Sequence, residues 1–144
     1  MPPQANRVEK YINISLIYAI GAMAGGVFYR EFTKFNGFTG NTSLGKVHTH
    51  LFLLGMIVFL LVALFAKHCD LKNRKSFKAF MCVYNIGVPL TSVMLLVRGI
   101  VQVLNISLTS AMNSAISGIA GVGHILTGVG IILLLLSLRK AVKK

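Results

Sequence analysis

Four long apolar runs, separated by short polar or basic segments, constrain what this chain can fold into more than any other feature. They cover residues 10–30, 46–66, 77–104 and 117–138. A helix of about 20 apolar residues crosses the hydrocarbon of a bilayer and satisfies every backbone polar group that lipid would leave unbonded. The sequence therefore predicts an all-α membrane protein in which residues 1–144 form one integral membrane domain.

Composition argues against a soluble domain of this length. The chain is 55% hydrophobic and only 12% charged, whereas soluble domains carry about 25% charged residues. In a soluble protein, the net charge of +12 would suggest a nucleic-acid partner. Here the basic residues lie between the apolar runs, where they contact anionic head groups. We expect the lipid bilayer as a partner and no nucleic acid.

The distribution of Lys and Arg predicts how the chain crosses the membrane. The N-terminal tail, the turn at residues 67–78 and the C-terminal tail at 139–144 hold most of them, whereas the two other loops hold Arg30, Lys34 and Lys46. Because basic loops stay on the cytoplasmic side, both termini are predicted to be cytoplasmic. Four spans with short loops favour a four-transmembrane-helix up-down bundle. We expect a multi-pass protein of the bacterial cell membrane.

Three histidines and two arginines, Arg30 and Arg98, from four different spans are expected at one depth near the outer surface. His48 and His50 lie in the first outer turn of the second span, and His124 lies one to two turns inside the fourth. Arg98 lies toward the outer end of the third span. Counted at about 1.5 Å per residue from the cytoplasmic charges, these residues fall within about 8 Å of one level. Ionisable residues within a membrane mark a candidate functional site.

A layer of imidazole and guanidinium groups is suited to haem. Histidine is a common axial ligand of haem iron, and arginine suits carboxylates such as the haem propionates. Gly121 and Gly128 share the helical face of His124 and would leave room for a flat macrocycle. Because His48 and His50 point about 200° apart on a helix, only one of them is expected to pair with His124. The sequence does not decide between the two.

The segment from His48 to Gly55 has the pattern His-x-His-x-x-x-Leu-Gly. It resembles a segment of small membrane proteins related to haem-copper oxidase subunit I and to the NnrS family. This resemblance implies haem ligation by a histidine of the second span. Most of the chain also resembles a group of uncharacterised four-span membrane proteins of Gram-positive bacteria. Oxygen reduction is not expected, because the chain is far shorter than an oxidase subunit and has only three histidines within its spans.

Together these features predict a b-type cytochrome-like membrane protein that binds haem b near the outer face, through His124 and one of His48 and His50. The three histidines are the candidate metal ligands, and Arg98 and the two glycines complete the candidate cofactor site. Electron transfer, haem handling or sensing are the expected roles, with a second copy of the chain or a redox protein as partner. No Ser-His-Asp set, carboxylate pair or phosphate loop can be built, so no enzymatic reaction is assigned.

An alternative from a different class of protein fits the same residues. In it, the chain forms a small oligomeric transporter or channel-like bundle whose histidines line an outer vestibule, and no haem is bound. The two alternatives differ in a simple observation. A haem protein has a visible spectrum, whereas a transporter supports a flux that needs no cofactor.

Overall fold

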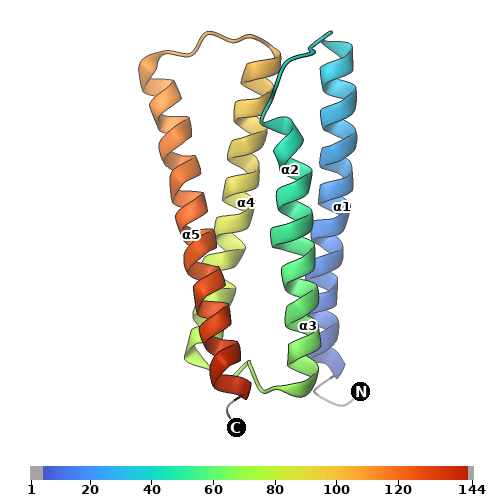
Figure 1. The fold of residues 1–144 in the computed structure, drawn as a ribbon, viewed down its shortest axis with the longest axis vertical. Helices are drawn as coiled ribbons and strands as arrows, with labels where there is room; N and C mark the ends of the chain where they lie inside the picture. The colour runs from blue at the N-terminus through green and yellow to red at the C-terminus, as the bar shows by residue number, and fades with distance from the viewer. Residues whose placement is uncertain (1–4, 143–144) are drawn as a thin grey trace.

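The computed structural model describes residues 5–142, and over that range the chain consists of helices and short connections (Figure 1). The elements are α1 (Ala5–Phe35), α2 (Leu44–His50), the π-helical turn η1 (Leu51–Ile57), α3 (Val58–His68), α4 (Lys75–Val103) and α5 (Ser110–Val142). α2, η1 and α3 follow one another without a break and form one continuous helical segment. We call the continuous helical segments rods: α1 is the first, α2–η1–α3 the second, α4 the third and α5 the fourth. Four rods are therefore present in the described chain, and each is long and apolar enough to cross a membrane. The predicted all-α fold is confirmed for the described residues, with four helical segments long and apolar enough to cross a membrane.

The four rods run alternately up and down, so both ends of the described chain lie at the same end of the bundle (Figure 1). We call this end proximal and the opposite end distal. That the proximal end faces the cytoplasm remains a prediction from the basic residues.

Two helices extend beyond the predicted spans. α1 continues to Phe35 rather than ending near residue 30, and α5 begins at Ser110 rather than near residue 117. Hydropathy marks only the part of a helix that faces lipid, so polar turns at the water boundary were not predicted. Thr109 directly precedes α5, and its hydroxyl accepts a hydrogen bond from the Met112 amide at 3.2 Å. This bond satisfies one of the free N–H groups in the first turn of the helix.

The connection between α1 and α2 is fixed at both of its ends. Gly37 ends α1 with a φ of 59°, the left-handed conformation that glycine adopts without a steric penalty. At the other end, the Thr42 hydroxyl donates to the Gly99 carbonyl at 3.1 Å, and the Ser43 amide donates to the Gln102 side chain at 2.7 Å. The start of α2 is therefore held against the distal end of α4.

The main cluster of buried apolar residues lies in the proximal half of the bundle. At its centre, the ring of Tyr84 lies 5.1 Å from that of Phe80 and 6.1 Å from that of Phe59, measured between ring centres. Phe77 and Tyr11 extend the cluster toward the termini. Aromatic rings at these separations contribute packing energy beyond the area they bury.

α4 and α5 pack together through glycines that allow a close approach of their backbones. A Cβ atom placed on Gly87 would lie 2.6 Å from the Thr127 amide nitrogen, and one on Gly123 would lie 2.9 Å from the Thr91 amide nitrogen. Small residues at such positions are typical of helix pairs in membranes, because the association of the helices depends on tight van der Waals contact.

The π-helical turn η1 directly follows His50 in the second rod. Hydrogen bonds in a π-helix run between residues five apart, so the backbone pairing of an α-helix is interrupted there. Hydroxyl groups from two neighbouring helices bond to this turn. Tyr84 of α4 donates to the Leu54 carbonyl at 2.7 Å, and Ser15 of α1 donates to the Met56 carbonyl at 2.8 Å. Side chains on both sides of the rod therefore support the turn.

Replacing Tyr84 by Phe removes the hydroxyl that bonds to this turn while keeping the ring in the core. We expect the free energy of unfolding to fall by about 1–2 kcal/mol, because the partly buried Leu54 carbonyl loses its partner. Denaturant unfolding in detergent measures this loss. Tyr29→Phe is the control, since the structure gives the Tyr29 hydroxyl no hydrogen-bond partner within residues 5–142. Equal stabilities of the two variants would contradict the assigned role of Tyr84.

Candidate functional site

Two of the three histidines predicted as ligands come together in the structure. The imidazole rings of His50, on α2, and His124, on α5, have centres 6.1 Å apart and planes inclined at 84°. They lie 74 residues apart in the sequence, on rods whose backbones make little direct contact. The pairing therefore arises from the tertiary fold.

Both imidazoles are oriented by the same local hydrogen bond. The Nδ1 atom of His50 lies 2.8 Å from the Lys46 carbonyl oxygen, and that of His124 lies 2.8 Å from the Ala120 carbonyl oxygen. A carbonyl oxygen only accepts, so Nδ1 carries the proton in each ring. In its neutral form, each ring with a proton on Nδ1 has an unprotonated Nε2, which is the form in which an imidazole binds a metal.

His48 lies elsewhere, against α1. Its ring stacks on that of Tyr29 with centres 6.4 Å apart and planes inclined at 15°, and its Cβ and ring atoms pack beside Gly26. The Nδ1 atom of His48 is buried without a hydrogen-bond partner among the described residues. The structure thus places His48 and His50 on different sides of α2, as the expected 200° between them requires, and only His50 lies beside His124.

Arg98, the predicted carboxylate-binding residue, reaches from α4 to the distal part of α5. Its Nη2 atom lies 2.7 Å from the Ser117 hydroxyl oxygen and 3.3 Å from the Asn113 side-chain oxygen. Ser117 precedes His124 by seven positions on α5, which corresponds to two helical turns or about 10 Å along the axis. The guanidinium is therefore distal to the histidine pair, and its contacts to these neutral groups leave its charge unneutralised.

Gly121 and Gly128 occur on the same face of α5 as His124, one turn before it and one turn after it. Nothing lies within 4 Å of a Cβ atom placed on either of them. In this they differ from Gly123 and Gly130, which face α4 and have close neighbours. α5 therefore has two glycine faces, one that packs against α4 and one that stays open around His124.

No group of three or more His, Cys, Asp or Glu side chains that could hold a metal ion occurs between residues 5 and 142. Of the three candidate ligands, His48 lies against α1, and only His50 and His124 lie together. A zinc ion usually needs four ligands or three and a water. Two imidazoles are therefore not enough for a site made of protein ligands alone, and a metal here must bring further ligands with it.

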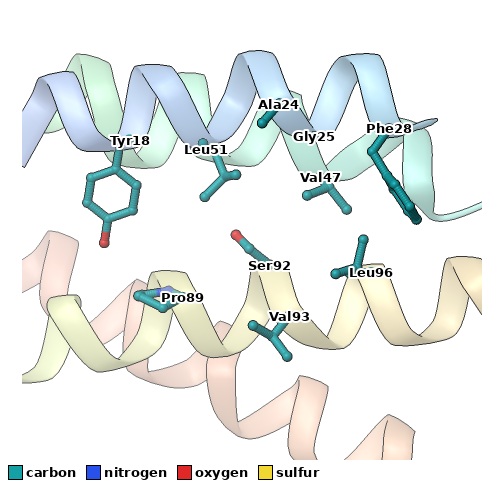
Figure 2. A pocket seen from close by; sticks show the side chains of 11 residues that line it. Tyr18, Ala24, Gly25, Phe28, Val47, Leu51, Pro89, Ser92, Val93 and Leu96 are labelled. Atoms are coloured by element: carbon teal, nitrogen blue, oxygen red, sulfur yellow. The ribbon is translucent and has the colours of Figure 1, made fainter. Parts of the chain in front are cut away.

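Sequence reasoning missed two features beside this site. One is the π-helical turn that follows His50, for which the apolar segment Leu51–Ile57 carries no distinguishing pattern. The other is an apolar cavity of about 420 Å³ between α1, the second rod and α4 (Figure 2). Its walls come from residues that are individually ordinary for membrane helices. Neither feature has a signal in a single sequence.

The fold and the site define a four-helix bundle whose helices are long and apolar enough to span a membrane, with a pair of neighbouring histidines on the second and fourth of them. The chain belongs to the family described as protein of unknown function (DUF2871), whose model matches residues 8–141. No curated protein and no solved structure matches the chain. The resemblance of the segment from His48 to Gly55 to haem-copper oxidase helices therefore gains no support from these comparisons, nor does an origin in Gram-positive bacteria.

Proposed function

We propose that this protein binds one haem b between α2 and α5, with His50 and His124 as its two axial ligands, and that it transfers electrons. The observation that carries the proposal is the separation of 6.1 Å between the two ring centres. Two imidazoles on opposite sides of one metal ion have ring centres about 6 Å apart, because each metal–nitrogen bond is about 2 Å and each ring centre lies about 1 Å behind its nitrogen.

The protonation of the two rings supports this role. Each Nδ1–H donates to a carbonyl one turn earlier in its own helix. Such a bond fixes the direction of the ring and raises the basicity of Nε2, which is how proteins generally orient a metal-bound histidine.

Haem fits the donor set better than a bare ion does. A haem iron already has four nitrogen ligands from its macrocycle, so two imidazoles complete its coordination. The macrocycle needs space beside the ligands, and the open faces of Gly121 and Gly128 border His124 where that space is required. Arg98 would bind a propionate, because a guanidinium forms paired hydrogen bonds with a carboxylate.

A haem held by both imidazoles would supply reversible one-electron transfer. The residues of this chain would perform the remaining tasks. His50 and His124 would hold the iron and keep other molecules from it, and their Nδ1–H groups hold both rings in place. The unneutralised charge of Arg98 favours a propionate at the distal end of the site. Electron transfer is the role that best suits two occupied axial positions.

Haem titration into the purified protein in detergent tests this proposal. We expect binding of one haem per chain and sharp visible bands in the reduced-minus-oxidised spectrum. The planes of the two imidazoles that would hold the iron are inclined at 84°, and such an inclination would keep two of the iron d orbitals close in energy. The oxidised protein should accordingly give a strongly anisotropic low-spin electron paramagnetic resonance signal. If no visible bands appear, the haem proposal fails; a cofactor-independent flux in liposomes would then favour the transporter.

Replacing Arg98 by Gln tests the contact with the propionate. We expect haem affinity to fall about tenfold, which is typical for the loss of one charge-assisted hydrogen bond. Haem dimethyl ester, which carries no carboxylate, should bind Arg98→Gln and the unaltered protein equally well. Equal losses of affinity for the two compounds would mean that Arg98 only supports the packing of α5. Spectrophotometric titration measures both affinities.

A further inference from the structure

The apolar cavity lies in the distal half of the bundle, between α1, the second rod and α4 (Figure 2). Its volume of about 420 Å³ falls within the range of sites for small organic ligands. The cavity is open on one side, and the α1 and α4 backbones hardly approach each other there. In a membrane, such an opening between two helices faces lipid. A molecule dissolved in the bilayer can therefore enter the cavity without crossing water.

One buried polar group points into this apolar space. Ser92 is only 5% exposed, and its hydroxyl has no hydrogen-bond partner among the described residues. Figure 2 shows this hydroxyl directed from α4 toward α1 and α2, across the cavity. A buried hydroxyl without a partner costs free energy, so such groups call for an explanation. A ligand that accepts a hydrogen bond at this point would supply the missing partner.

A second hydroxyl borders the same space. Tyr18 of α1 projects toward α4 near Pro89, with its hydroxyl at the end facing α4 (Figure 2). Its ring is held by stacking on Phe59, with ring centres 5.7 Å apart. Two hydroxyl donors therefore border an otherwise apolar cavity, one on each side. No Asp, Glu, Lys, Arg or His side chain is among the residues that line it.

We infer that this cavity binds the ring of a lipid-soluble quinone, with the Ser92 hydroxyl donating to one ring carbonyl. A quinone combines a flat apolar ring, carbonyl acceptors and a hydrocarbon tail, which match the apolar walls, the hydroxyl donors and the opening toward lipid. A lipid acyl chain would fill the volume but would leave Ser92 without a partner. This inference is independent of the proposed haem, although Val47 and Leu51 border the cavity on a face of the second rod adjacent to that of His50.

Binding of a short-tailed quinone to the purified full chain in detergent tests the inference. The control ligand has the same ring size and tail but lacks the carbonyl groups. Quenching of tyrosine fluorescence reports binding directly, because the chain contains four tyrosines and no tryptophan. A rise in the unfolding temperature with ligand concentration gives an independent readout. We expect the quinone to bind at least fivefold more tightly than the carbonyl-free compound.

Three substitutions make the test specific. Ser92→Ala should weaken quinone binding about fivefold and leave binding of the carbonyl-free compound unchanged. The ligand-free protein should not lose stability, because the Ser92 hydroxyl has no partner to lose. Ala24→Leu, which fills the cavity from α1, should weaken binding of both compounds. Ser137→Ala is the matched control, since Ser137 is also buried without a partner but does not line the cavity. It should bind both compounds normally.

Two results would overturn the inference. Equal affinities of the unaltered protein for the quinone and the carbonyl-free compound would show that the cavity selects only for apolar surface, as a site for a lipid tail does. Unchanged quinone binding by Ser92→Ala would show that this hydroxyl takes no part in recognition.

Discussion

Replacing His124 by Ala is expected to abolish the low-spin haem spectrum of the protein. The imidazole of His124 is one of the two rings that face each other across 6.1 Å, and a single remaining imidazole cannot hold the iron in six-coordinate form. His50→Ala should have the same effect, because the two ligands act as a pair. We expect the affinity for haem to fall by at least a hundredfold in each variant, as judged by titration and by the visible spectrum.

Two matched substitutions separate ligation from general loss of structure. His48→Phe keeps an aromatic ring against Tyr29 but removes the imidazole, and His68→Ala removes an exposed histidine beyond the proximal core. Both should retain the full haem spectrum. Free imidazole should partly restore the spectrum of His124→Gly by occupying the vacated position. A full spectrum in His124→Ala, or its loss in His48→Phe, would show that the ligands have been assigned to the wrong residues.

Replacing Gly87 by Leu is expected to separate α4 from α5. Any Cβ atom at this position would lie 2.6 Å from the Thr127 amide nitrogen and 2.9 Å from the Leu126 carbonyl carbon. These are backbone atoms, which cannot rotate away as a side chain can. We expect the free energy of unfolding to fall by about 3 kcal/mol or more, at the upper end of overpacking effects. Denaturant titration in detergent measures this change.

Gly118→Leu is the control for this substitution, because it introduces the same side chain on α5 where nothing lies within 4 Å of the new Cβ atom. Its stability should remain close to that of the unaltered protein, apart from a gain in helix propensity. If Gly87→Leu is as stable as Gly118→Leu, the close packing of α4 and α5 does not hold the bundle together. Haem titration of Gly87→Leu should also show weaker binding, since α5 carries His124.

The helices could be predicted from the sequence because each apolar run is long and is bounded by charged or polar residues. Their ends could not, since the polar turns of α5 from Ser110 onward differ little in composition from a loop. The shared level of His50 and His124 was accessible through residue counting. Residue counting could not show which histidine of the second span faces α5. The rotation of that rod about its axis is fixed by tertiary contacts such as the stacking of His48 on Tyr29.

The cavity beside α2 illustrates a further limit of sequence reasoning. The cavity exists because the side chains of three rods do not fill the space between them. The size of such a gap depends on the distances between the helices, which the spacing of residues in the sequence does not determine. Ser92 reads in the sequence as an ordinary small polar residue of a membrane helix. Only its lack of a partner in the structure sets it apart. The same holds for Arg98, whose position relative to Ser117 required coordinates.

The π-helical turn η1 also sets how far the distal half of the second rod is rotated about the helix axis relative to the proximal half. In a regular α-helix each residue adds about 100° of rotation, so the direction of His50 would follow rigidly from the face by which α3 packs into the proximal core. A wider turn at Leu51–Ile57 breaks that link. The side chain of His50 can then face α5 while that of Phe59 faces the proximal core. The length of this segment, more than its composition, would be the quantity that selection has to preserve.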